Sequence, residues 1–198
     1  MSVLICNFMT QNYASSFYEA LPKYNTTFKD CSFFVASEVC KDWVNEYSVS
    51  RLKNKCIDAA RILNVDWMVM MTGIDSSLME IPDLKNLDDE IIHVGKRTET
   101  TNDCAHACSL HLLSRKIYNK YKYNEFYRFY WDDFDYFYNV TKGVNKKEVD
   151  NFLCFHKKHN SLASENEFVK ARFEKEKQMF YLEYEKLYGY SFDDRNKV

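Results

Sequence analysis

The chain has 198 residues, a hydrophobic fraction of 46% and a formal net charge of −2 at pH 7. That length allows one domain with a substantial core, and the slightly acidic balance argues against an obligate nucleic-acid-binding protein, which is usually strongly basic. The opening sequence MSVLICNFMTQ has no signal-peptide pattern, and no apolar run approaches the roughly 20 residues of a membrane span, so we expect a soluble, cytoplasmic protein without a membrane partner.

Apolar segments alternate with helical patterns along the first 75 residues. Strands are predicted at residues 3–8, 31–36 and 67–71, and helices at residues 14–21, 39–46 and 48–63. In the last of these helices, Leu52, Cys56 and Ala60 recur at helical spacing and form a face that packs on a sheet. The alternation predicts parallel strands joined by helical crossovers, and ligands bind beyond the carboxyl ends of such strands.

The rest of the chain predicts a second group of elements and a long C-terminal helix. Strands are expected at residues 90–94, 104–113 and 149–155, short helices at 114–121 and 132–142, and an amphipathic helix at 165–188. Gly143 would end the second short helix. Together the elements predict a single α/β domain, a three-layer α/β/α arrangement around a mixed, mostly parallel sheet, with a C-terminal helix.

An acidic cluster followed by a histidine pair is the most informative feature of the sequence. The segment Trp131-Asp132-Asp133-Phe134-Asp135 places three carboxylates in four positions. Such acids repel one another unless a cation, a proton or a substrate relieves them. About two dozen residues later, His156 and His159 flank two lysines, a pattern that indicates a metal or phosphate site. The plainer alternatives are a solvated helix N-terminus, where acids complement the helix dipole, and two surface histidines.

Three stretches of sequence resemble one enzyme class. They are SRLKNKCIDAA at 50–60 with DWMVMM at 66–71, SLHLLSR at 109–115 with FYWDDFD at 129–135, and FHKKHNS at 155–161. In this order they resemble the GT-A class of nucleotide-sugar glycosyltransferases, the small family-2-like enzymes and, near the C-terminus, the β-1,4-galactosyltransferase pattern. The resemblance implies one GT-A-like domain over 1–198, with a nucleotide-binding half at 1–75, an acceptor and metal half at 76–162, and a C-terminal helix at 163–190.

The resemblance also implies a reaction and the residues that perform it. The reaction is an inverting transfer from a nucleoside-diphosphate sugar, with a UDP-sugar favoured, and a divalent cation, Mn²⁺ or Mg²⁺, neutralises the departing diphosphate. Asp133 matches the catalytic base that removes the proton of the acceptor hydroxyl. Asp132 is its catalytic neighbour, and Trp131 and Asp132 would bind the acceptor, whose identity the sequence does not reveal.

The expected metal site departs from the pattern of this class. At the end of the third strand the class has an Asp-x-Asp motif, whereas this chain has Thr72-Gly73-Ile74, with Asp75 one place later. The candidate metal ligands are therefore Asp75, His156 and His159, and because the class usually has one histidine here, the sequence leaves open which of the two matches. Either Asp75 replaces the motif, or the metal site is weakened or missing and cations stabilise the leaving group. In the second case the cations would be Arg51, Lys55, Lys157 and Lys158.

The donor site is expected at the ends of the first three strands and on the helix that follows the second. The residues that the resemblance assigns to it are Thr10, Gln11, Ser37, Glu38, Arg51, Lys55, Thr72 and Gly73. Arg51 and Lys55 lie one helical turn apart and would face phosphates together.

Two other functions fit parts of the sequence. Residues 114–128, SRKIYNKYKYNEFYR, interleave five cations with five aromatic residues, as a surface that stacks on bases and follows a phosphate backbone would do. A DNA acceptor is therefore possible, although tyrosines that lie on the core explain the same pattern. The second alternative is a non-catalytic GT-A-like domain that acts as an interaction module.

Overall fold

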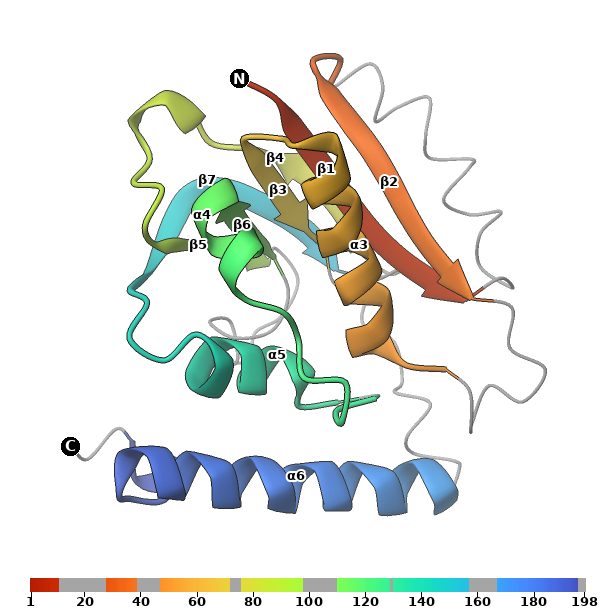
Figure 1. Cartoon of the computed structure of the whole chain (residues 1–198), viewed down its shortest axis with the longest axis vertical. Coiled ribbons are helices and arrows are strands. Elements are labelled where there is room, and N and C mark those ends of the chain that lie inside the picture. The colour runs from red at the N-terminus through yellow and green to blue at the C-terminus, as the bar shows by residue number, and fades with distance from the viewer. Residues whose placement is uncertain are drawn as a thin grey trace.

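The computed structural model describes residues 1–10, 28–38, 47–71, 76–97, 110–128, 130–156 and 167–195. Seven strands form one mixed sheet in the order β2-β1-β3-β6-β5-β7-β4 (Figure 1). Their bounds are β1 Val3–Thr10, β2 Cys31–Glu38, β3 Trp67–Met70, β4 Ser76–Glu80, β5 Ile92–Arg97, β6 His111–Ser114 and β7 Lys146–His156.

In the described part of the chain, four α-helices accompany the sheet. They are α3 Val49–Leu63, α4 Arg115–Lys120, α5 Asp132–Phe134 and α6 Glu167–Tyr188. A π-helix, Asp135–Val140, continues α5 without a break, and 3-10 turns occupy Leu84–Asn86 and Phe192–Asp194. The expected helices at 114–121 and 165–188 are confirmed, whereas those at 14–21 and 39–46 lie outside the described residues. The third layer that they would form therefore remains a prediction.

The N-terminal half of the sheet has the predicted parallel arrangement. β1 pairs in parallel with β2 on one side and with β3 on the other. Helix α3 lies between β2 and β3 in the chain, and it begins where the Ser48 hydroxyl accepts a hydrogen bond from the Arg51 N–H. It ends at Asn64, which adopts the left-handed conformation of a helix C-cap.

The other half of the sheet differs from the prediction in its pairing. β6 runs antiparallel to both β3 and β5, and β7 pairs in parallel with β5 and antiparallel to β4. The described sheet therefore has as many antiparallel as parallel neighbours, so the expectation of a mostly parallel sheet was too strong. Strand β4 was missed because SSLME carries no alternating apolar pattern, and β5 extends to Arg97, beyond the expected end of that strand at residue 94.

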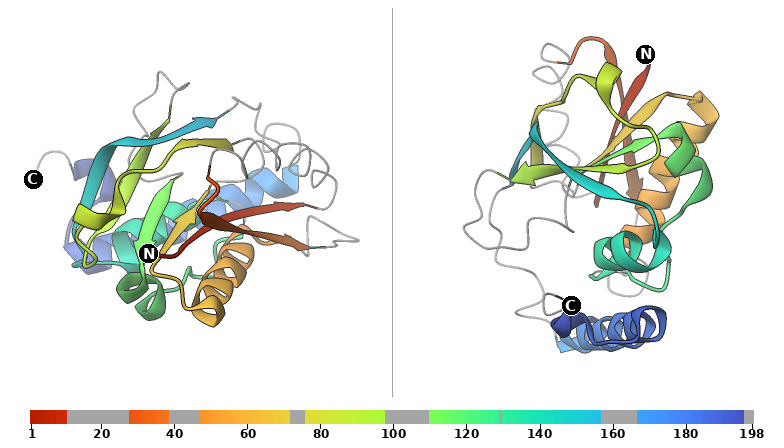
Figure 2. Two further views of the ribbon diagram at one scale, coloured as in Figure 1. Left: turned by 90° about the horizontal axis from the view of Figure 1, so that it is seen from above. Right: turned by 90° about the vertical axis from the view of Figure 1, so that its left-hand side faces the viewer.

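The sheet has a core on each face. One face packs on α3 and α4 through Leu52, Ile57 and Tyr118. On the other face, Leu78 of β4 and Phe152 of β7 pack with Ile5 and Val69. Figure 2 shows why this is possible, because β7 and β4 arch over the side of β1 and β3 that is opposite to α3 and α4. The sheet thus curls over its own second face.

Helix α6 packs on the body of the molecule through a third, aromatic cluster. Phe180 and Tyr184 of α6 contact Tyr127 and Phe192 there. The buried Glu176 carboxylate accepts hydrogen bonds from the Arg128 and Tyr130 backbone N–H groups, at 2.8 and 3.0 Å. Helix α6 is therefore fixed to the segment that immediately precedes the acidic cluster. Among the described helices, none combines the length and the apolar character that crossing a membrane requires.

Candidate active site

The strand directions place most of the predicted site segments at one edge of the sheet. Because β3 and β5 both run antiparallel to β6, and β7 runs parallel to β5, the strands β1, β2, β3 and β7 all point the same way. Thr10 pairs with Glu38 and Met9 with Ser37 where β1 and β2 end. His156 ends β7 at the same edge, which is where ligands bind in α/β sheets.

Helix α3 brings a buried lysine to the acidic cluster. The Lys53 side chain is 2% exposed, and its Nζ lies 2.7 Å from Asp132 Oδ2 and also donates to Asp133 Oδ1. It lies over the Tyr123 ring, 4.9 Å from the centroid. Burial by itself would lower the pKa of Lys53, but the two carboxylates outweigh burial and raise it above its ordinary value. Lys53 is therefore a permanent cation at this site.

The two acids differ in their access to solvent. The Asp132 side chain is 6% exposed and that of Asp133 is 16% exposed. Burial raises the pKa of Asp132 to about 6; Lys53 opposes this increase and the Asp133 charge adds to it. The two carboxylates and Lys53 therefore lie in largely water-excluded surroundings, and Asp133 is the more exposed of the two acids.

Helix α3 also fastens the chain that leads to the acids. The Asn54 amide donates to the Tyr123 carbonyl and accepts from the Tyr123 N–H, at 3.0 and 2.8 Å. The Ser50 hydroxyl donates to the Tyr127 carbonyl, and the Val49 N–H donates to the Arg128 carbonyl. One face of α3 thus supplies both the lysine and the hydrogen bonds that hold the acidic segment beside it.

Trp131 turns the chain into the acidic helix. Its φ of 63° lies in the left-handed region, which is uncommon for residues other than glycine. Its ring packs on Phe173 and Phe180 of α6, with centroids 5.8 and 5.4 Å apart. These contacts secure the unusual turn that presents Asp132 and Asp133. The structure therefore shows a packing role for Trp131, and its expected contact with an acceptor stays a prediction.

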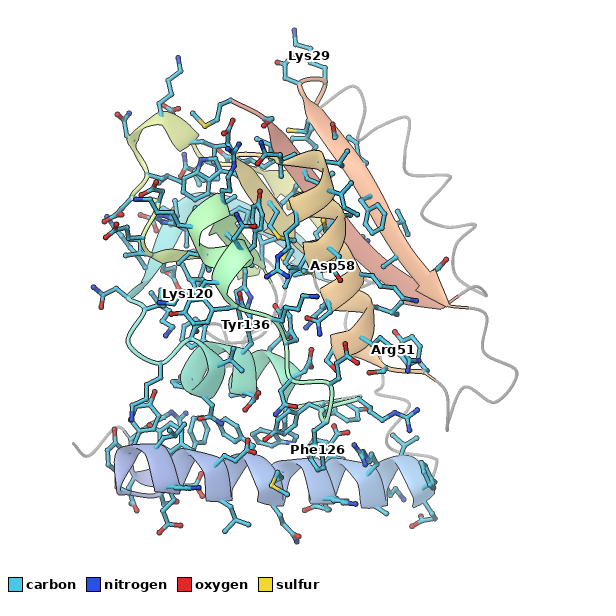
Figure 3. All side chains as sticks on the ribbon, viewed as in Figure 1. Lys29, Arg51, Asp58, Lys120, Phe126 and Tyr136 are labelled. Carbon is cyan, nitrogen blue, oxygen red and sulfur yellow. The ribbon has the colours of Figure 1, made fainter. Side chains whose placement is uncertain are left out.

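The expected helix at 132–142 exists, but most of it is a π-helix. The Thr141 N–H and hydroxyl both bond to the Tyr136 carbonyl, and Gly143 follows with a φ of 84°. π-Helical turns are rare and are frequent at functional sites. Figure 3 shows Tyr136 between this helix and the sheet, and its ring stacks on that of Tyr123 at 4.1 Å. The acidic helix is thus packed directly against the residues that surround Lys53.

The predicted phosphate ligands on α3 do not face the acids. Arg51, at the first turn of α3 in Figure 3, and the exposed Lys55 are each two residues from Lys53. Two residues rotate the side-chain direction by about 200°, so both lie on the opposite side of the helix. Sequence reasoning missed Lys53, although Lys53 precedes Cys56 and Ile57 by three and four positions and so belongs to the buried face. A lysine on an otherwise apolar helix face would have indicated a buried cation that needs an acidic partner.

The structure describes the predicted metal and donor sites only in part. Gln11, Thr72, Gly73, Asp75 and His159 lie outside the described residues, and only the backbone of Thr10, Glu38 and His156 is described. In the described part of the chain no group of three His, Cys, Asp or Glu side chains is arranged to hold a metal ion. The backbone nevertheless pairs His156 with Ser76, the residue directly after Asp75.

The aromatic-basic segment at 114–128 does not form a base-stacking surface. Tyr118, Tyr123 and Tyr127 are buried in the protein core. Lys116 pairs with Asp89 and Glu90, and Lys122 pairs with Asp58. The described side chains therefore do not support the nucleic-acid interpretation of this segment, because these three tyrosines lie in the core while Lys116 and Lys122 are paired with acids.

Two solved structures are similar to the chain over most of its length. One is a glycosyltransferase involved in the glycosylation of the major capsid of PBCV-1, with 11% identity, coverage of 90% of this chain and 100% of that chain, and a TM-score of 0.56. The other is a mutant of Drosophila β1,4-galactosyltransferase 7 in complex with manganese, UDP-Gal and xylobiose, with 13% identity, coverage of 83% and 73%, and a TM-score of 0.58.

The chain shares its fold with these two glycosyltransferases. The structural likeness confirms the expected α/β class and the resemblance at the level of architecture. No protein-family model matches the chain, and neither does the sequence of any curated protein. At such low identity the likeness establishes the fold, and the chemistry has to be argued from this chain's own residues.

Proposed function

We propose that the protein is a glycosyltransferase that moves a sugar, with inversion, from a nucleoside-diphosphate sugar to an acceptor hydroxyl. A UDP-sugar is the favoured donor. The observation that carries the proposal is the buried cluster of Lys53, Asp132 and Asp133 on a fold shared with two glycosyltransferases. A desolvated carboxylate pair held by one cation is costly to build, and sites of this kind are frequently catalytic.

Asp133 is the proposed general base. The acceptor oxygen attacks the anomeric carbon of the donor while the bond from that carbon to the diphosphate oxygen breaks. The acceptor proton passes to the Asp133 carboxylate, and the bonding electrons leave with the diphosphate. Asp133 suits this role better than Asp132 because it is the more exposed of the two. Asp132 then serves mainly as the counter-ion of Lys53.

The proposed donor site occupies the edge where β1, β2 and β3 end. Thr10, Gln11, Ser37, Glu38, Thr72 and Gly73 would contact the nucleoside there. The pairing of Thr10 with Glu38 supports this placement because it brings two of these segments together. Arg51 and Lys55 remain candidates for the phosphates from the outer side of α3. The acceptor is proposed to be a carbohydrate or another molecule with an accessible hydroxyl group.

A divalent cation, Mn²⁺ or Mg²⁺, is proposed to neutralise the diphosphate when it is bound. Asp75, His156 and His159 would hold it. The pairing of Ser76 with His156 supports this set, because it places the residue after Asp75 opposite the histidine. A carboxylate oxygen with imidazole nitrogens suits a borderline metal such as manganese better than magnesium.

The test of the base is the variant Asp133→Asn, with Asp150→Asn as the matched control. The Asp150 side chain is 93% exposed and lies on β7, so its loss should leave transfer unchanged. We expect Asp133→Asn to lower the transfer rate by about 10²–10⁴-fold, the usual contribution of a general base. Donor binding, followed as the rise in melting temperature with UDP-sugars and manganese, should persist. Full activity in Asp133→Asn would refute the assignment.

A non-catalytic interaction module is the second candidate. It is favoured by Thr72-Gly73-Ile74, which replaces the acid expected at the end of the third strand. A panel of UDP, GDP, CDP and UDP-sugars, with and without manganese, separates the two. A metal-dependent rise in melting temperature with one nucleotide supports the enzyme. No change with any nucleotide, at concentrations far above ordinary dissociation constants, supports the module.

A further inference from the structure

Lys53 is a buried, charged side chain that takes no direct part in the proposed reaction. Among the side chains that the structure describes, those of Asp132 and Asp133 and the face of Tyr123 meet its Nζ. The lysine comes from α3 and the acids from α5, 79 and 80 residues later. An ammonium group held in this way lacks the water that it would have at the surface, and the two carboxylates replace that water.

We infer that Lys53 is the positioning residue of the base, which keeps Asp133 ionised and in a single orientation for proton abstraction. This inference rests on the proposed function. A nearby cation favours the charged form of a carboxylate, whereas burial and a second carboxylate disfavour it. Without Lys53, Asp132 and Asp133 would be two adjacent desolvated acids, and one of them would take up a proton. The lysine therefore favours the state in which both acids are ionised, with Asp133 able to accept the proton of the acceptor.

The arrangement also explains why two acids are needed. If Lys53 faced Asp133 alone, the pair would be neutral and the carboxylate would be a weak proton acceptor. With Asp132 as a second partner, the three groups together carry one negative charge when both acids are ionised. That charge is available at Asp133, the more exposed member. Asp132 thus neutralises the lysine while Asp133 meets the acceptor.

The experiment compares wild type with Lys53→Met, Lys53→Arg and the double variant Lys53→Met/Asp132→Asn. The double variant removes one positive and one negative charge together and therefore leaves no additional unpaired buried charge. It can be measured even if Lys53→Met does not fold. The control is Lys120→Met, which removes an exposed lysine on α4. Each protein is measured for donor-induced thermal shift, for kcat and KM, and for the pH profile of kcat/KM.

We expect Lys53→Met to retain the donor-induced thermal shift and the KM for donor, and to lose at least 10-fold in kcat at pH 7. The acidic limb of its pH profile should move to higher pH by one unit or more, so that activity recovers in part at alkaline pH. Lys53→Arg should keep the wild-type profile with a smaller loss of kcat. A purely structural lysine would lower stability without moving the pH profile.

The outcomes separate this inference from the proposed function. The role of Lys53 is refuted, and the enzyme stands, if wild type transfers sugar and Lys53→Met keeps both the wild-type kcat and the wild-type pH profile. Where Lys53→Met does not fold, a wild-type kcat in the double variant refutes it, because that variant keeps the charge balance and loses only the group that orients Asp133. If wild type transfers no sugar, the proposed function fails first. In that case the titration of the aspartate carboxyl carbons by NMR still tests the Lys53 effect. Identical titration of these carbons in wild type and Lys53→Met would overturn it.

Discussion

The three carboxyl groups at the start of one short helix have two different kinds of partner. Asp132 and Asp133 meet a buried lysine from α3. Asp135, on the same turn, faces the carboxyl of Glu183 on α6 and accepts a hydrogen bond from Asn139 at 2.9 Å. Its Oδ2 is buried and receives no hydrogen bond in the described structure. Within the described residues, the cation that the structure places beside these acids contacts only the first group.

The difference shows how one acidic motif can serve two purposes. The pKa of Asp135 is raised to about 7, mainly by burial and further by the Glu183 carboxyl. Asp135 therefore holds a proton in mildly acidic solution. A protonated Asp135 can share that proton with Glu183 and thereby link the acidic helix to α6. The pair beside Lys53 instead contacts a cation, which favours the ionised form of a carboxylate. Position in the fold, rather than residue type, assigns the roles.

The sharpest way to break the comparison is to remove the cation. Lys53→Met should lower the free energy of unfolding by about 3–5 kcal/mol, the usual cost of leaving a buried ion without its partner. Urea unfolding at pH 7 measures it. The double variant Lys53→Met/Asp132→Asn should recover a substantial part of the loss because it removes one of the two acids. A loss below about 1 kcal/mol in Lys53→Met would mean that the lysine is not required to balance the acids.

The second way is to remove the proton-holding acid. The pKa of Asp135 is raised in the folded protein, so the unfolded chain releases this proton first as the pH rises. The contribution of Asp135 to stability is therefore fully present below about pH 4 and is lost as the pH rises to about 7. Asp135→Asn should thus stabilise the protein by up to about 4 kcal/mol above pH 7, and by little near pH 4.

Urea unfolding at several pH values, with wild type and Asp135→Asn side by side, measures this difference. The gain of the variant should increase between pH 5 and pH 7.5. A gain that is the same at every pH would show that Asp135 does not titrate in this range. A loss of stability at pH 8 would show that the carboxylate is stabilised by a group other than the ones described here.

The smallest expected effect concerns the hydrogen bond that fixes Glu183. The Tyr127 hydroxyl donates to Glu183 Oε2 at 2.8 Å, and the Tyr127 ring is fully buried. Tyr127→Phe should cost about 1 kcal/mol, the usual net contribution of one hydrogen bond. The control Tyr121→Phe should remain within about 0.5 kcal/mol of wild type. Equal effects of the two variants would argue that the Tyr127 hydroxyl does not hold α6 in place.

Much of the architecture could be predicted from local pattern. The apolar run at 67–71 became β3, the face of Leu52, Cys56 and Ala60 became the buried face of α3, and the charged segment after residue 165 became α6. These elements depend on side-chain periodicity, which the sequence displays directly. β4 could not be predicted, because an edge strand with one buried apolar residue has no such period and is defined by its partner β7.

The sequence by itself determined the α/β class and the first three parallel strands, and it singled out Asp132 and Asp133 as candidates. Only the tertiary structure decided that Lys53 is their partner, that Asp135 belongs with Glu183, and that Trp131 packs on α6. The physical reason is that helix and strand periods are local, whereas the neutralisation of a buried charge depends on which distant segment the topology brings beside it. For Lys53 and Asp132 that segment lies 79 residues away.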